Sequence, residues 1–256
     1  MQYQELIFDL YGTLVDIHTE ENDLVWEKTA FFFGFYGAQY SAQSLKSAFS
    51  AELARREANA GQTYECFPDI PVEQVMAALF RAQNVENAEA LGLQAAQLFR
   101  ISSLEYIRLY PHVLEALTAL RRAGCRLWLL SNAQRAFTAY ELRLLGLEPY
   151  FDGIYISSDY GCRKPDLRFF RALLQEQGIC PAKCLMIGND RLTDIAGAKN
   201  AGMATLYLHT NLTPSDQAPA DPSLRPGNAS EGCVHLEYEG ADWRKIAQWI
   251  GSQTGV

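Results

Sequence analysis

The chain has 256 residues, 48% hydrophobic and 20% charged, which is typical of a globular protein with one large domain or a core plus a smaller domain. Its formal net charge of −8 argues against binding to a nucleic-acid backbone, because such binding needs clustered Lys and Arg. A small anionic substrate remains compatible with this charge, since it needs only a local positive site.

A short buried strand is predicted near the N-terminus. The run Glu5–Leu10 is largely apolar, contains Asp9 near its end and leads into the turn residue Gly12. From about residue 17 to residue 108, apolar residues recur at three- and four-residue spacing, which predicts amphipathic helices. Because this span shows no buried-strand pattern, we expect it to form an all-helical insert.

After Tyr110-Pro111 the pattern changes to strands that alternate with helices. Such alternation predicts crossover units and a parallel sheet. Residues 211–232 are rich in Pro, Ser, Asp and Ala and are expected to form an irregular surface loop. Strands are predicted at residues 125–132, 153–158, 183–190, 204–209 and 234–240, and helices at residues 113–124, 139–147, 166–178, 193–203 and 242–253.

Four polar clusters lie at the ends of predicted strands or just beyond, where open parallel sheets bind ligands. In-line displacement at phosphorus requires an attacking carboxylate, donors for the phosphoryl oxygens, and further acids that hold a divalent cation. The clusters supply these groups. They are Asp9 to Thr13, Ser131 with Asn132, Lys164 with Pro165, and Gly188 to Asp190 with Asp194.

The segments DLYGTLVD, LLSN, RKPD and IGNDRLTDIAGAKNAGM occur in this order, and together they resemble the four motifs of haloacid dehalogenase-like hydrolases. Each motif alone is a weak signal, whereas all four in order at predicted strand ends are a strong one. The resemblance covers essentially the whole chain. It implies an α/β fold with a doubly wound parallel-sheet (Rossmann-like) core at residues 1–15 and 108–256, and an inserted all-helical cap domain at residues 16–107.

The resemblance implies a role for each matching residue. Asp9 would be the nucleophile that forms an aspartyl intermediate. Thr13 and Ser131 would hydrogen-bond the transferring group with Asn132 beside them, and Lys164 would bridge the nucleophile and the phosphoryl oxygens. The family further implies a Mg²⁺ cofactor, whose ligands would be Asp9, the backbone carbonyl of Tyr11, Asp190 and Asp194.

Two positions depart from the phosphatase pattern of the family. Asn189 stands where many members have the first acid of the fourth motif, and we expect Asp190 to be the closer ligand instead. Tyr11 occupies the position at which the phosphatases carry an aspartate that serves as general acid and then base. The haloacid dehalogenases themselves carry Tyr there and use no metal. A phenol with an ordinary pKa of about 10 is a poor base at neutral pH.

The acid pair Asp190 and Asp194 argues for a metal, because like charges so close are costly unless a cation lies between them. We therefore expect a Mg²⁺-dependent phosphatase that acts on a small phosphorylated metabolite. Two alternatives stay open: a metal-independent 2-haloacid dehalogenase-like hydrolase, and a catalytically weak binding or regulatory protein.

The partners and location are predicted from what the sequence lacks. Its N-terminus has no basic region followed by a long apolar run, and no apolar stretch reaches the roughly 18 residues that span a bilayer. We expect a cytoplasmic protein, monomer or homodimer, with a small anionic substrate and with neither nucleic acid nor membrane as partner.

Overall fold

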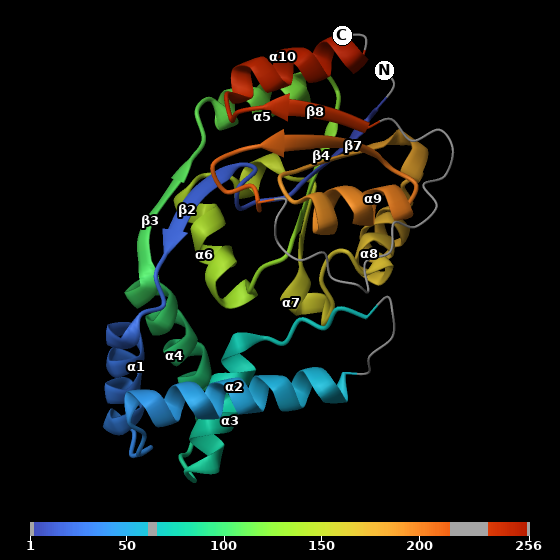
Figure 1. Ribbon diagram of the computed structural model, residues 1–256. Helices are drawn as coiled ribbons and strands as arrows, with labels where there is room; N and C mark the ends of the chain where they lie inside the picture. Colours follow the sequence, from blue (N-terminus) through green and yellow to red (C-terminus); the bar gives the residue numbers. More distant parts are fainter. Residues whose placement is uncertain (1–2, 61–65, 216–234, 255–256) are drawn as a thin grey trace.

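The core of the chain is a parallel sheet, seen in a computed structural model that describes residues 3–60, 66–215 and 235–254 (Figure 1). Six strands lie in the order β5-β4-β1-β6-β7-β8, and each neighbouring pair is parallel. The predicted α/β fold class with a parallel sheet is confirmed. The strands are β1 (Glu5–Phe8), β4 (Arg126–Ser131), β5 (Gly153–Ile156), β6 (Cys184–Gly188), β7 (Ala204–His209) and β8 (His235–Glu239).

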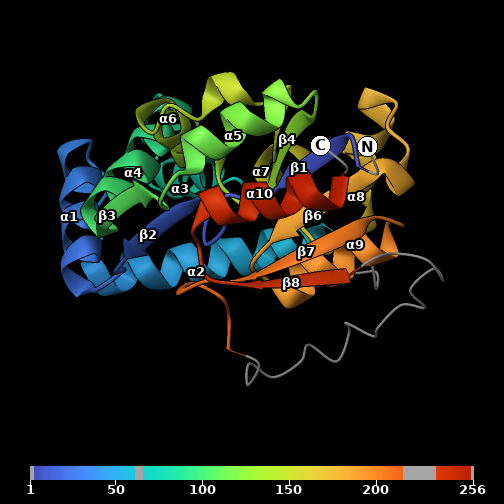
Figure 2. The same cartoon turned by 90° about the horizontal axis from the view of Figure 1, so that it is seen from above.

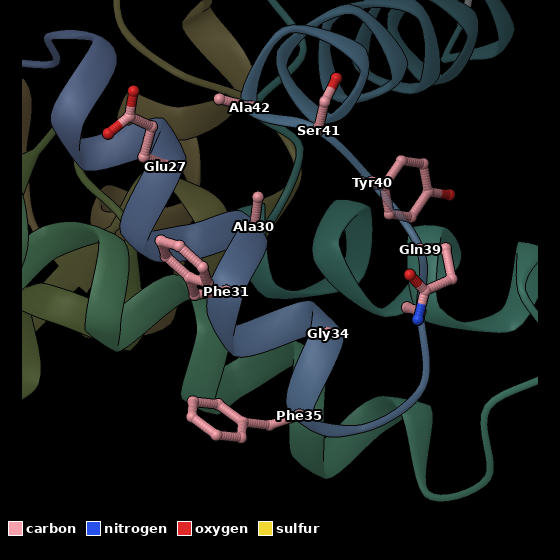
Figure 3. Close-up of a pocket in the computed structure, with 10 residues that line it drawn as sticks. Glu27, Ala30, Phe31, Gly34, Phe35, Gln39, Tyr40, Ser41 and Ala42 are labelled. Carbon is pink, nitrogen blue, oxygen red and sulfur yellow. The ribbon is translucent and has the colours of Figure 1, made fainter.

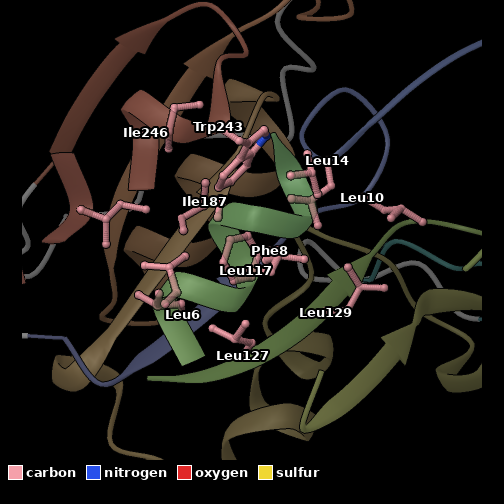
Figure 4. Packing of buried hydrophobic residues seen from close by; sticks show 14 of the residues in the cluster. Leu6, Phe8, Leu10, Leu14, Leu117, Leu127, Leu129, Ile187, Trp243 and Ile246 are labelled. Carbon is pink, nitrogen blue, oxygen red and sulfur yellow. The ribbon is translucent and has the colours of Figure 1, made fainter. Parts of the chain in front are cut away.

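Helices cover both faces of this sheet. Successive side chains of a strand point to opposite faces, and here both faces carry apolar side chains that need to be buried. Phe8 of β1 packs in one apolar cluster with Trp243 (Figure 4), whereas Ile7 packs in a second cluster with Phe170. Central strands buried on both faces are typical of doubly wound folds. The core helices are α5 (Val113–Arg122), α6 (Arg135–Leu144), α7 (Ser157–Tyr160), α8 (Leu167–Gln177), α9 (Gly197–Asn200) and α10 (Trp243–Thr254), with short 3₁₀ turns at Glu148–Tyr150 and Pro181–Lys183 and a π-helical turn at Arg191–Ala196.

Four helices inserted after the first strand form a cap beside the core (Figures 1 and 2). They enclose their own apolar cluster, in which the rings of Phe33 and Phe80 stack with centroids 3.8 Å apart. This cluster also packs against Phe137 of α6, so the cap and the core share apolar contacts. The cap helices are α1 (Asp23–Phe35), α2 (Ala42–Asn59), α3 (Val72–Ala82) and α4 (Ala88–Ser103).

The expectation that residues 16–107 are all helical is wrong at both ends of that span. Strands β2 (Val15–Thr19) and β3 (Leu104–Leu109) pair antiparallel and connect the core to the cap helices (Figure 1). Ile17 and Ile107 face each other in this ribbon and pack against the core cluster. The two strands lie far apart in sequence. The backbone hydrogen bonds of each strand are made with the other, and no local pattern reveals this pairing.

Two further expectations concern the rest of the chain. Most of the loop predicted at residues 211–232 lies outside the described residues. Among the residues that are described, no helix combines the length and the apolar character needed to cross a bilayer.

Candidate active site

Asp9 lies just beyond the carboxyl end of β1, which has β4 and β6 as neighbours on its two sides. Its backbone N–H donates to the carbonyl of Ile187 at 3.0 Å, which fixes Asp9 at the middle of the sheet edge. The chain then turns at Gly12, whose φ is +81°; a Cβ at this position would lie 2.2 Å from Nδ2 of Asn189. Glycine therefore permits both the turn and the close approach of the fourth motif.

Three side chains donate to the Asp9 carboxylate. Lys164 Nζ lies 2.8 Å and Ser131 Oγ 3.3 Å from Oδ1, whereas Thr13 Oγ1 lies 3.4 Å from Oδ2. The Thr13 hydroxyl is also 3.2 Å from Oδ1 of Asn189, the shorter of its two contacts. The Oδ2 atom of Asp9 is therefore the less occupied of the two carboxylate oxygens.

Lys164 is the buried cation of the site, with 1% of its surface exposed. Its ammonium donates to Asp9 at 2.8 Å, to Asp194 at 2.6 Å and to the carbonyl of Leu130 at 2.8 Å, so all three donors have acceptors. Burial alone would lower the pKa of Lys164, but the two carboxylates raise it above its ordinary value. Asn132 holds the lysine backbone, accepting from its N–H at 2.7 Å and donating to its carbonyl at 3.0 Å.

The fourth motif places two acids at the same edge. Asp190 caps the following helical turn, because its Oδ1 accepts from the N–H groups of Leu192 at 2.8 Å and Thr193 at 3.0 Å. Asp194 is 1% exposed, and its Oδ2 accepts from the N–H of Asp190 at 3.0 Å. A Cβ at Gly188 would lie 2.2 Å from this oxygen, so the glycine lets Asp194 reach the end of β6.

Burial raises the pKa of the Asp194 carboxyl above its ordinary range, with Lys164 opposing the rise and Asp9 adding to it. The single ammonium therefore compensates the neighbouring carboxylates only in part. Excess negative charge in a partly buried cleft is costly unless a cation is present.

These residues surround a cleft of about 220 Å³. Thr13 and Ser131 are buried and hydrogen-bond the Asp9 carboxylate without lining the cleft themselves. The structure thus brings all the predicted site residues together at one edge of the sheet. The predicted residues that line the cleft are Asp9, Tyr11, Asn132, Lys164, Asp190 and Asp194, and they are joined by Asn189, Thr193, Leu212 and Pro214.

The donor set of the cleft fits Mg²⁺. Three carboxylates and one ammonium line the cleft, and oxygen ligands suit this hard cation. No three acidic, imidazole or thiol groups of the described residues converge into a complete metal centre. Mg²⁺ does not require one, because it usually keeps several waters and binds through few carboxylates together with substrate phosphate.

Tyr11 lines the cleft, but its hydroxyl is directed away from Asp9 into a buried polar network. It donates to Glu141 Oε2 and lies 3.1 Å from Thr138 Oγ1. Arg100 of the cap helix α4 donates to the same carboxylate, with Nε 2.7 Å from Glu141 Oε1. Burial raises the pKa of Tyr11 above its ordinary value, and the Glu141 carboxylate adds to this. At neutral pH the Tyr11 phenol is therefore even less ionised than a free tyrosine.

Arg100 and Glu141 are two residues of the site that the sequence did not reveal. Both occupy ordinary positions of amphipathic helices, and Glu141 lies 130 positions from Tyr11 and 41 from Arg100. Asn189 was visible as a departure from the motif, although its contact with Thr13 was not.

A separate hollow of about 500 Å³ lies on the cap between α1 and the segment that leads into α2 (Figure 3). Phe31 and Phe35 form one wall and Tyr40 lies opposite, while Glu27 is the single carboxylate among its described lining residues. It offers no pair of groups for acid–base or nucleophilic chemistry. The candidate active site is therefore the Asp9 cleft.

Comparison with known proteins is consistent with this site. A family model described as haloacid dehalogenase-like hydrolase matches residues 6–202. Among curated relatives, glyceraldehyde 3-phosphate phosphatase of Methanothermobacter thermautotrophicus is 32% identical, with 52% of this chain and 62% of that protein covered. Phosphoserine phosphatase of Thermus thermophilus is 35% identical, with 48% of this chain and 49% of that protein covered. The chain thus spans about half to three fifths of the length of these two relatives.

Other similarities extend over more of the chain. Human N-acylneuraminate-9-phosphatase is 24% identical, covering 84% of this chain and 86% of that protein. The solved structure of a 2-haloacid dehalogenase from Pseudomonas syringae has a TM-score of 0.62 at 18% identity, covering 97% and 99% of the two chains. A HAD phosphatase from Thermococcus onnurineus has a TM-score of 0.55 at 17% identity, covering 97% and 98%. At these identities the two structures establish the shared fold.

Proposed function

The chain belongs to the haloacid dehalogenase-like hydrolase family, and from this premise we propose that it is a Mg²⁺-dependent phosphatase of a small phosphorylated metabolite. The observation that carries the proposal is that Asp9, Lys164 and the acid pair Asp190 and Asp194 meet in one cleft. The phosphatases among its relatives support the same chemistry.

In the proposed reaction, Oδ2 of Asp9 attacks the phosphorus in line with the bond to the leaving group. That bond breaks, its electron pair leaves with the leaving oxygen, and an aspartyl phosphate remains. Water then attacks the same phosphorus, which releases inorganic phosphate and a proton and restores the Asp9 carboxylate. Lys164 stabilises the charge that develops between Asp9 and the phosphoryl oxygens, because it already contacts the nucleophile.

Mg²⁺ would be held by Asp9, Asp190, Asp194 and the backbone carbonyl of Tyr11, in part through its own waters. When bound, it neutralises the charge of the phosphate that would otherwise repel the Asp9 carboxylate. Asn132 keeps Lys164 in position, and the buried hydroxyls of Thr13 and Ser131 orient Asp9. We further propose that the chain acts in the cytoplasm as a monomer or homodimer, without nucleic acid or membrane as partner.

Dehalogenase-like chemistry is the second candidate, and Tyr11 is the feature that favours it. A halide leaves without a proton, so this reaction needs no general acid at position 11, where the Tyr11 hydroxyl already donates to Glu141. The acid pair Asp190 and Asp194 favours the phosphatase, because displacement of halide creates no phosphate charge for a cation to neutralise.

The test is hydrolysis of p-nitrophenyl phosphate with and without Mg²⁺. We expect chelation to abolish the activity and added Mg²⁺ to restore it. Asp9→Asn should be inactive, whereas the surface variant Asp23→Asn should remain active. Activity that persists unchanged after exhaustive chelation would remove the metal from the proposal. Release of chloride from 2-chloropropionate, without phosphate hydrolysis, would establish the second candidate.

A further inference from the structure

A second cavity of about 260 Å³ lies between the cap and the core, and we call it the cap–core pocket. The cap contributes residues of α1, α2, α3 and α4, and the core contributes α6 and the segment before Lys164. Its lining includes the aromatic rings of Trp26, Phe49, Phe99 and Phe137 and the carboxylates of Glu57 and Asp69.

The cap–core pocket adjoins the catalytic cleft along two loops. Gln134 and Arg163 line it, whereas Asn132 and Lys164, close to them in sequence, line the cleft. Arg100 also lies between the cleft and the pocket. Its guanidinium carbon is 5.6 Å from the ring centre of Tyr11, which lines the cleft, and 5.3 Å from that of Phe137, which lines the pocket. The two hollows therefore meet at Arg100, across which a group attached to a phosphate at Asp9 would have to reach to enter the cap–core pocket.

Aromatic rings make up much of the pocket wall. Trp26 packs edge-on against Phe49 and Phe99, with centroid distances of 5.6 and 4.8 Å. Aromatic rings carry negative charge on their faces and attract organic cations, Trp most strongly.

The charged residues of the pocket are mainly acidic. Asp69 accepts from Gln134 at 2.7 Å and from Ser157, so its oxygens are already engaged. Burial raises the pKa of Asp69, the contacts with Ser157, Arg163 and Gln134 oppose this rise, and the Glu57 carboxylate adds to it. Glu57 is half-buried, and its side chain has no hydrogen-bond or ion-pair partner among the described residues. With Glu21, Glu57 and Asp69 against Arg163, the pocket lining carries more carboxylates than cations.

We propose that the cap–core pocket binds an alkylammonium group of the substrate, so that the substrate is a phosphorylated compound that carries an organic cation. The aromatic wall and the Glu57 carboxylate would select a positive charge, whereas Lys164 and the proposed Mg²⁺ of the neighbouring cleft would select the phosphate. This assignment rests on the proposed phosphatase function for its substrate, but the binding of the cation can be measured alone.

The test is calorimetric titration of the full chain with choline and with 3,3-dimethylbutanol, which has the same shape with carbon in place of the charged nitrogen. We expect choline to bind about ten-fold more tightly, as cation–π attraction and one free carboxylate provide. Glu57→Gln should reduce this preference to within about three-fold. Glu86→Gln, on the exposed cap surface, is the matched control and should keep the full preference.

Equal binding of the two ligands, or an unchanged preference in Glu57→Gln, would overturn the assignment. Hydrolysis of p-nitrophenyl phosphate, measured on the same preparations, separates this outcome from failure of the proposed function. Turnover without choline preference refutes the cation site alone, whereas choline preference without any phosphatase activity supports the site and refutes the phosphatase. In an active enzyme, kcat/KM should also be higher for phosphocholine than for 3,3-dimethylbutyl phosphate.

Discussion

The position of Tyr11 predicts an unusual dependence on the leaving group. At pH 7 a phenol with an ordinary pKa of about 10 is ionised in only about one molecule in a thousand, and burial lowers that fraction further here. Its proton is donated to Glu141 and not toward the cleft. Tyr11 can therefore neither deprotonate the attacking water nor protonate a departing alkoxide.

General acid catalysis typically contributes about 10²–10⁴-fold to the rate. Without it, the wild-type chain should hydrolyse aryl and acyl phosphates at least about 10²-fold faster than alkyl phosphates. Tyr11→Phe should leave aryl phosphate turnover within about ten-fold of wild type, although loss of the donor to Glu141 costs about 1–3 kcal/mol of stability. Tyr11→Asp should raise alkyl relative to aryl turnover. Tyr11→Asn is the control, because it matches Asp in size but has no titratable proton.

The assay is the dependence of kcat/KM on leaving-group pKa across a series of substituted phenyl and alkyl phosphates. We expect a steep negative slope for wild type and a shallower slope for Tyr11→Asp alone. A flat slope in the wild-type protein would refute the reasoning, because another group would then have to supply the proton.

Two further predictions follow from buried charges. Arg100→Ala removes the partner of a nearly buried Glu141 and should lower the free energy of unfolding in urea by about 3 kcal/mol. The exposed pair of Arg55 is the control, and Arg55→Ala should cost less than about 1 kcal/mol; equal losses would contradict the ion-pair assignment. The raised pKa of Asp194 means that the metal-free folded state binds a proton more readily than the unfolded chain. The stabilisation from this group should be complete below about pH 4 and be lost as pH rises through the raised pKa, and a pH-stability profile that Asp194→Asn leaves unchanged would contradict it.

Much of the core could be predicted from the sequence because its signals are local. Residues 5–8 and 184–188 are buried on both faces, so their apolar runs mark central strands, and the polar residues that follow mark the sheet edge. The positions of the motifs at strand ends predicted that Asp9 and Lys164 lie close together. In the structure Lys164 Nζ is 2.8 Å from Asp9 Oδ1.

The parts that the sequence did not reveal depend on partners distant in the chain. Residues 104–109 continue a helical pattern, yet they form β3 because β2 pairs with them across the whole cap insert. The contacts that Glu141 makes with Tyr11 and Arg100 also join elements that are separate in sequence. The β2–β3 ribbon and the Arg100 contact depend on how the cap is placed against the core, whereas the Tyr11 contact depends on how α6 is placed against the sheet, and no local pattern encodes either.

Direct detection of a phosphorylated Asp9 tests the central claim of the account. The protein would be mixed with radiolabelled acyl phosphate and Mg²⁺, quenched in acid during turnover, digested and mapped by mass spectrometry. We expect label on the peptide that contains Asp9, stable in acid and released by hydroxylamine, and none in Asp9→Asn. Phosphate release that continues while Asp9 stays unlabelled, or label on another residue, would contradict the account.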